Sequence, residues 1–182
     1  AQAAPPALLL ALTAPGDVFL AEPTTYPGLR AAATQFGRRI IAVEADRHGM
    51  VPAMLEQACR QHQPGLVYLN PTLQNPTAIT MPERRRKELA GIAKRCNVRI
   101  VEDDPYWLLA DAAPPPIATF APEQVIYIST LSKCLTPGLR VAFVLVRDAQ
   151  ELERFLAALR SFALMAAPLS GALATQWILD GS

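Results

Sequence analysis

The sequence predicts an α/β fold of three layers, in which a mostly parallel sheet with one antiparallel strand has helices on both faces. Short apolar runs of strand length alternate with longer segments of helical periodicity, which is the pattern of a parallel sheet with helical crossovers. The connection between the last two apolar runs contains Pro137-Gly138 and lacks a helical pattern. It is barely long enough for a parallel crossover, so we expect the final strand to be antiparallel.

Proline and glycine mark the element boundaries in the first half of the chain. Ala7 to Leu12 is a short apolar helix candidate, with Pro5-Pro6 able to occupy its first turn. The next elements follow as alternating strands and helices. The expected strands are Val18–Ala21, Arg39–Val43 and Leu66–Leu69, and the expected helices are Leu29–Phe36 and Val51–His62, with a turn at Asp46–Gly49.

The second half begins with a stronger helix signal. Thr80-Met81-Pro82-Glu83 has the spacing of a capping box with a proline in the first turn, and Asn97 ends this helix. The basic run from Arg84 to Lys87 is interpreted as the solvated side of the helix, opposite an apolar stripe. The remaining expected strands are Val98–Val101, Val125–Ile128 and Val141–Val146, and the remaining helices are Glu151–Phe162 and Leu169–Leu179.

Composition argues against several classes of function. The 182 residues suffice for one domain with a core, and the net charge of +1 offers no electrostatic case for nucleic-acid binding by this chain itself. The three cysteines provide neither a metal-binding spacing nor a disulfide framework, which fits a reducing cytoplasm. No apolar run reaches the length of a membrane span, and the apolar start lacks a basic leader. We expect a cytoplasmic protein without a metal site.

Polar and aromatic residues follow several of the expected strands. Tyr26 follows the first strand, Asn75 the third, Asp103 and Tyr106 the fourth, and Lys133 the fifth. In parallel sheets, ligands bind beyond the carboxyl ends of the strands. These residues are therefore expected to converge on one edge of the sheet and to form a site there.

The stretch after the fifth strand indicates a lysine beside a phosphate. Thr130 and Ser132 precede Lys133, and Arg140 follows it; all three are side chains that bind anions. If the phosphate belongs to an aldehyde cofactor, the lysine amine can form a Schiff base with it. A lone lysine at a strand end would be only a solvated charge, so the interpretation depends on its neighbours.

A phosphorylated pyridine aldehyde would use the other strand-end residues. An ionised Asp103 could face the ring nitrogen and favour its protonated form. Asn75 and Tyr106 could hydrogen-bond the ring hydroxyl, and Tyr26 could stack on the ring. Each residue alone has a structural alternative, because loop tyrosines often pack and Asp-Asp-Pro or Asn-Pro-Thr often form turns. Their joint occurrence at strand ends favours a site.

These motifs resemble those of the fold-type I pyridoxal 5′-phosphate family, the aspartate aminotransferase superfamily (class I/II). The matching motifs are Asn75-Pro76-Thr77, Asp103-Asp104-Pro105-Tyr106 and Thr130-Leu131-Ser132-Lys133, with Arg140 as the phosphate arginine and Tyr26 as the stacking aromatic residue. Ala78 replaces the glycine of the family's Asn-Pro-Thr-Gly. The resemblance implies a Schiff base on Lys133, a contact of Asp103 with the pyridine nitrogen, and a cis Asn75–Pro76 bond.

Within the superfamily, Glu22–Gly28 and Leu131–Arg140 are most similar to the aminotransferase-like domain of MocR-type regulators of the GntR class. This similarity implies a domain that binds pyridoxal phosphate and an amino acid or amine effector, while another domain binds DNA. Aminoadipate-type aminotransferases share much of the pattern. The alternative is therefore a free class I/II aminotransferase that transfers an amino group to a 2-oxo acid, and a third possibility is a vestigial cofactor site.

The resemblance also bears on domain organisation. Family members are much longer, so we expect residues 1–182 to be a single fragment, the core of the large pyridoxal-phosphate-binding domain. A small C-terminal domain and an N-terminal winged helix-turn-helix have no counterpart in it. Relatives form their site at a dimer interface, so a homodimer is expected for the full-length protein. The fragment alone is expected to be inactive and to expose apolar surface where the small domain belongs.

Overall fold

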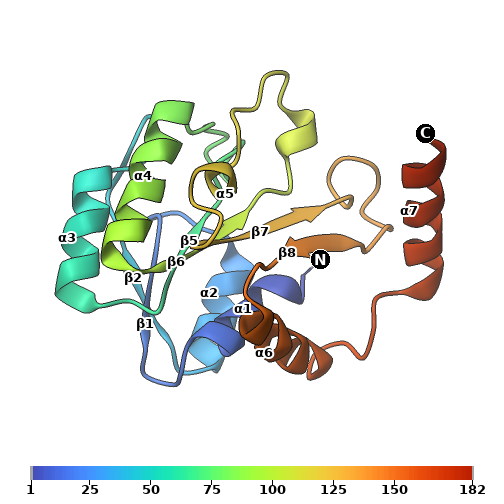
Figure 1. Cartoon of the computed structure of the whole chain (residues 1–182), viewed down its shortest axis with the longest axis horizontal. Helices are drawn as coiled ribbons and strands as arrows, with labels where there is room; N and C mark the ends of the chain where they lie inside the picture. The colour runs from blue at the N-terminus through green and yellow to red at the C-terminus, as the bar shows by residue number, and fades with distance from the viewer. Residues whose placement is uncertain (1, 182) are drawn as a thin grey trace.

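The computed structural model describes residues 2–181 and contains a six-stranded sheet with the strand order β2-β1-β5-β6-β7-β8 (Figure 1). The first five of these strands are parallel, and β8 runs antiparallel to β7. The strands of this sheet are β1 (Val18–Ala21), β2 (Arg39–Ala42), β5 (Leu66–Leu69), β6 (Arg99–Asp103), β7 (Val125–Thr130) and β8 (Ala142–Leu145). The predicted α/β class and the predicted antiparallel strand are confirmed.

Helices cover both faces of the sheet, as predicted. The helices are α1 (Ala4–Leu12), α2 (Pro27–Gln35), α3 (Pro52–His62), α4 (Glu83–Cys96), α5 (Ile117–Phe120) and α6 (Ala149–Arg160) on the two faces, and α7 (Pro168–Asp180) at one end of the molecule. One apolar core joins α3, α4 and α5 to one face of the sheet, and a second core joins α1, α2 and α6 to the other face. Among the described helices, none is long and apolar enough to cross a bilayer.

Three short features were missed. The turn at Asp46–Gly49 belongs to a small antiparallel hairpin of β3 (Ala45–Asp46) and β4 (Gly49–Met50). A 3-10 helix, η1 (Trp107–Leu109), and the four-residue α5 lie in the segment between β6 and β7. These elements are too short to show a hydrophobic period, which explains why the sequence pattern did not indicate them.

The capping box expected at the start of α4 is not formed. Pro82 is the N-cap residue of the helix and lies before its first turn, and no side chain caps the free N–H groups. The Thr80 Oγ1 instead accepts a hydrogen bond from the backbone N–H of Leu73 at 3.1 Å. Thr80 therefore shapes the preceding loop rather than the helix.

The interpretation of Arg84 to Lys87 as a solvated face is wrong for Arg86. Its side chain is fully buried, with Nε donating to Met81 O at 2.9 Å and Nη2 donating to Pro71 O at 3.1 Å and to Thr72 Oγ1 at 3.0 Å. Its Nη1 lies 3.8 Å from Glu102 Oε1, and both of these side chains are inaccessible to solvent. Arg86 is thus a structural charge between α4 and the sheet.

Large apolar side chains are exposed on α7 and on the segment before it, at one end of the molecule (Figure 1). They include Leu164, Met165, Leu169, Ile178 and Leu179. The inner side of α7 packs through Ala174 and Trp177 against Leu139 and Val141. The chain therefore exposes apolar surface as expected, while the assignment of this surface to a small domain stays a prediction.

Candidate functional site

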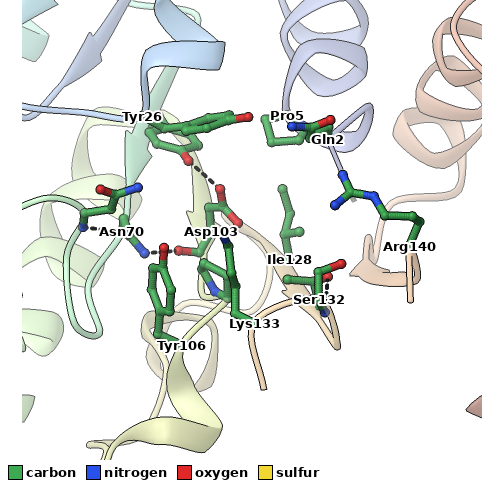
Figure 2. Close-up of a pocket in the computed structure, with 14 residues that line it drawn as sticks. Gln2, Pro5, Tyr26, Asn70, Asp103, Tyr106, Ile128, Ser132, Lys133 and Arg140 are labelled. Atoms are coloured by element: carbon green, nitrogen blue, oxygen red, sulfur yellow. Dashed lines mark hydrogen bonds between the residues drawn. The ribbon is translucent and has the colours of Figure 1, made fainter. Parts of the chain in front are cut away.

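A pocket lies at the carboxyl edge of the parallel strands, on the side of the sheet that α1 and α2 cover (Figure 2). The residues predicted from the strand ends and from the lysine stretch all line it. They are Tyr26, Asn75, Asp103, Tyr106, Thr130, Ser132, Lys133 and Arg140. The structure therefore brings together residues that are up to about a hundred positions apart in the chain, whereas their individual roles in binding stay predictions.

Asp103 is the carboxylate of this pocket and lies at the end of β6. Its Oδ2 accepts a short hydrogen bond from the hydroxyl of Tyr68, which is 2 % exposed on β5. Burial raises the pKa of Asp103 to about 6, the neighbouring Asp104 acts in the same direction, and the bond from Tyr68 opposes them. Asp103 is therefore mostly ionised at neutral pH.

Asn70 connects Asp103 to the loop that carries Asn75. Its Nδ2 donates to Asp103 O at 2.7 Å, and its Oδ1 accepts from the backbone N–H of Asn75 at 2.8 Å (Figure 2). The peptide bond between Asn75 and Pro76 is cis, as the resemblance implied. Asn70 thus fixes the start of the Asn-Pro-Thr turn relative to the strand end.

Tyr68 and Asn70 were not among the predicted site residues. A signal for Tyr68 was present, because a hydroxyl in the apolar run Leu66–Leu69 must find a partner when it is buried. Asn70 stood in the first of two Asn-Pro-Thr units, and only the second unit received a role. Both residues could have been found by asking which group satisfies each polar atom at the strand ends.

Gln74 connects the Asn75 loop to the Tyr26 loop. Its Nε2 donates to Thr24 O at 2.6 Å, and its Oε1 accepts from the Thr77 backbone N–H at 3.0 Å and from the Thr77 hydroxyl at 2.6 Å. Gln74 is itself buried. Two loops that leave different strands are therefore held in one arrangement at the edge of the pocket.

Tyr26 forms one side of the pocket and lies over Gly28. A β-carbon at Gly28 would come within 2.5 Å of Cζ and of the hydroxyl oxygen of Tyr26. Figure 2 shows the Tyr26 ring above Asp103 and the Tyr106 side chain approaching from the opposite side. The absence of a side chain at Gly28 is thus what allows the Tyr26 ring to take this position.

Lys133 and Arg140 are the cations of the pocket, and both are exposed. Within residues 2–181, the Arg140 guanidinium makes only one hydrogen bond, a long one of 3.4 Å from Nη1 to Pro137 O. The Lys133 amine has no hydrogen-bond or ion-pair partner among these residues. Both cations are therefore available to a ligand.

Thr130 and Ser132 line the pocket but also shape its lysine loop. The Thr130 hydroxyl donates to Val141 O at 2.8 Å, and the Ser132 hydroxyl donates to Leu139 O at 2.8 Å. Each hydroxyl has a single hydrogen. To donate to a phosphate, each must therefore release its carbonyl partner, so the predicted phosphate contacts compete with the bonds that close the loop.

The chemistry of the pocket fits a ring with a basic nitrogen and an anionic substituent. A carboxylate with one side-chain partner stands in its centre, tyrosine rings lie on two sides, and a guanidinium extends from another side toward Gln2 and Pro5 (Figure 2). An exposed amine completes the set at Lys133. No group of three or more His, Cys, Asp or Glu side chains suited to a metal ion occurs in the described part of the chain.

Comparisons with known proteins agree with this chemistry. The family described as aminotransferase class I and II matches residues 1–180. The HTH-type transcriptional regulator YdeF of Bacillus subtilis is 37 % identical over 174 residues, which are 96 % of this chain and 37 % of the regulator. Aromatic-amino-acid aminotransferase 1 of Thermococcus litoralis is 35 % identical over 138 residues, which are 71 % of this chain and 33 % of that enzyme.

Solved structures show the same fold. LysN, an α-aminoadipate aminotransferase of Thermus thermophilus solved with N-(5′-phosphopyridoxyl)-L-leucine, is 30 % identical with a TM-score of 0.90 over 99 % of this chain and 48 % of its own. Aminotransferase Aro8 of Candida albicans is 25 % identical with a TM-score of 0.86 over 97 % of this chain and 43 % of its own. The chain thus spans less than half the length of each of these relatives.

Proposed function

Because the chain belongs to the class I and II aminotransferase family, we propose that it is a pyridoxal 5′-phosphate-binding domain and that residues 1–182 are the core of the large domain of a longer protein. The observation that carries the proposal is the pocket in which an exposed lysine, the partly buried carboxylate of Asp103 and an exposed arginine meet at the strand ends. Within residues 2–181, the Lys133 amine has no partner, Arg140 has only the long bond to Pro137 O, and the Asp103 carboxylate has only Tyr68, so packing alone does not explain why these charges lie together.

Each lining residue has a role toward this cofactor. Lys133 would hold it covalently through Nζ, and Asp103 would hold the ring nitrogen through its carboxylate. Asn75 and Tyr106 would bind the ring oxygen, and Tyr26 would cover one face of the ring. When bound, pyridoxal phosphate supplies an aldehyde that reacts with amines and a ring that stabilises negative charge on a bound amino acid.

The phosphate would lie against Arg140, whose guanidinium can make a two-pronged contact with an anion. Thr130 and Ser132 would add hydroxyl donors once they release Val141 O and Leu139 O. Arg140 is exposed and directly follows the loop that carries Lys133, so the conformation of this loop shapes the anion site. We therefore expect the loop from Leu131 to Leu139 to become more protected from hydrogen exchange when the cofactor binds.

For the full-length protein, we propose a MocR/GntR-type transcriptional regulator in which this domain binds the cofactor and an amino acid or amine effector. The match of 96 % of this chain to the regulator from Bacillus subtilis supports this proposal. DNA would be bound by a winged helix-turn-helix domain outside residues 1–182. We further propose a cytoplasmic homodimer with a small C-terminal domain, and no transaminase activity for residues 1–182 alone.

The second candidate is a free aminotransferase, which the enzyme relatives at 35 % identity support. In that case the amine of Lys133 would also take the Cα proton of the amino acid substrate. The two candidates need the same cofactor pocket, so the residues described here do not separate them. Steady turnover of an amino acid with a 2-oxo acid by the full-length protein favours the enzyme, and effector-dependent operator binding without turnover favours the regulator.

The cofactor proposal is tested through the lysines, which within residues 1–182 are Lys87, Lys94 and Lys133. Pyridoxal phosphate added to the full-length protein should give an absorbance band of bound cofactor, and borohydride reduction should leave the label on the Lys133 peptide. Lys133→Ala should abolish the band, whereas Lys94→Ala, which changes an exposed lysine on α4, should keep it. Absence of the band in the unchanged protein, or label on another lysine, would contradict the proposal.

A further inference from the structure

Two residues of the neighbouring chain segment hydrogen-bond Asp103. Tyr68 lies on strand β5, and Asn70 directly follows that strand. The Tyr68 hydroxyl donates to the Asp103 carboxylate, and Asn70 binds the Asp103 carbonyl at 2.7 Å. Tyr68 is aligned with Val101 in the parallel register, so strand alternation places its side chain on the same face of the sheet as Asp103. The contact is therefore fixed by the sheet itself and not by a flexible loop.

We propose that Tyr68 is a positioning residue that holds the Asp103 carboxylate in place to face the ring nitrogen of the cofactor. This inference rests on the proposed function. Tyr68 borders the pocket, yet its side chain is almost fully buried, and its hydroxyl is the only side-chain group within residues 2–181 that is bonded to the Asp103 carboxylate. A rigid donor on one oxygen leaves the other oxygen to the pocket.

The charges around Asp103 show why this donor matters. Burial and the neighbouring Asp104 raise the pKa of Asp103, and only the hydrogen bond from Tyr68 among nearby side chains lowers it. Burial and Asp103 together raise the pKa of Tyr68 well above its ordinary value, so Tyr68 stays a neutral donor. The other titratable groups that line the pocket are Tyr26, Tyr106, Lys133 and Arg140.

The test compares two tyrosines that each contact a neighbouring aspartate. Tyr68→Phe removes the donor to Asp103, and Tyr127→Phe removes a hydroxyl whose oxygen lies 3.4 Å from Asp104 Oδ2. Both substitutions keep the ring, and Tyr127 does not line the pocket. In the full-length protein, Tyr68→Phe should raise the dissociation constant of pyridoxal phosphate about tenfold or more, whereas Tyr127→Phe should change it by less than about twofold.

A double-mutant cycle separates positioning from general packing. If Tyr68 acts through the carboxylate, Tyr68→Phe should change the cofactor affinity by less than about twofold once Asp103→Asn is present. The acid limit of cofactor binding should also move to higher pH in Tyr68→Phe, because Asp103 then protonates more easily. An unchanged affinity in Tyr68→Phe, or an equal loss with and without Asp103→Asn, would overturn the proposal.

A measurement without cofactor distinguishes failure of this inference from failure of the proposed function. Carboxyl carbon NMR of the unliganded protein should show Asp103 titrating at higher pH in Tyr68→Phe than in the unchanged protein. An unchanged midpoint overturns the role of Tyr68 even if the protein binds pyridoxal phosphate. A protein that binds no pyridoxal phosphate overturns the proposed function and, with it, the cofactor-directed role of Tyr68.

Discussion

Glu102 and Asp103 are neighbours on β6, and their side chains lie on opposite faces of the sheet in very different surroundings. Glu102 is fully buried, and its two oxygens accept backbone hydrogen bonds from Ile117 at 2.8 Å and from Ala118 at 2.9 Å, with Arg86 beside them. Asp103 has one side-chain donor, Tyr68, and faces the pocket. Both carboxylates are costly to bury, but only Asp103 has an oxygen left for a ligand.

Glu102 is thus a structural carboxylate and Asp103 a proposed functional one, and the two faces of the sheet on which they lie are connected through Arg86. Arg86 binds the carbonyls of Pro71 and Met81, which lie at the two ends of the loop that carries Asn75. The backbone N–H of Met81 also donates to Pro71 O at 2.8 Å, which closes the same loop. Arg86, which packs beside Glu102 on one face of β6, therefore also holds the loop that carries Asn75. Asn75 is one of the proposed ligand contacts in the pocket on the other face.

The largest effect is expected from Arg86→Met. It leaves the buried Glu102 without its cation and removes the bonds of Arg86 to the carbonyls of Met81, Pro71 and Pro115, so the free energy of unfolding should fall by about 3–5 kcal/mol. Denaturant unfolding followed by circular dichroism measures this. Arg84→Met is the matched control, because the Arg84 side chain is 90 % exposed, and it should change stability by less than about 0.5 kcal/mol. A loss below about 1 kcal/mol for Arg86→Met would show that Glu102 is not held by charge.

The pH dependence of stability should report the carboxyl groups whose pKa burial raises, of which Asp103 is the one in the pocket. Burial raises the pKa of Asp103 from 3.8 to about 6 and the pKa values of Glu22 and Glu102 from 4.5 to about 7. The folded protein therefore binds protons that the unfolded chain has lost, so stability should fall as the pH rises from about 5 to about 8. Asp46, whose pKa the Arg85 contact lowers to about 2, acts in the opposite direction only below about pH 4.

Thermal unfolding of the unliganded protein between pH 5 and pH 8 measures this dependence. Asp103→Asn should flatten the curve and raise the unfolding temperature at neutral pH, because a neutral amide is less costly to bury than an ionised carboxylate. A curve that rises with pH over this range, or one that Asp103→Asn leaves unchanged, would mean that Asp103 is stabilised as an anion by groups other than Tyr68.

The fold could be predicted because apolar runs of strand length alternate with segments of helical periodicity. Asp103 was predicted from its spacing from Tyr106 in the Asp-x-x-Tyr motif. The sequence pattern assigned Glu102 no role, because the contacts that make Glu102 a structural carboxylate come from residues that are close in space and not in sequence. A signal for Arg86 was present, since it precedes Leu89 and Ala93 by three and seven positions and thus lies on the buried stripe of α4. The capping box failed because Pro82 itself occupies the N-cap.

The smallest effect is expected from Gly28→Ala, which changes only the space beside the pocket. The new methyl group would overlap the Tyr26 ring at 2.5 Å, so the ring must rotate away from the pocket. Because Gly28 lies in the first turn of α2 and has no left-handed backbone, alanine there should leave stability within about 1 kcal/mol.

Cofactor affinity, measured by titration with pyridoxal phosphate, should fall about threefold to tenfold in Gly28→Ala, since stacking on the ring contributes about 1 kcal/mol. Gly171→Ala in α7 is the matched control, because a β-carbon there meets no atom within 4 Å. If both variants bind equally well, Tyr26 does not cover the ring. Tyr26 would then have only a structural role, as Glu102 does. The ligand would be held by Asp103, Lys133 and Arg140, with no aromatic ring stacked on it.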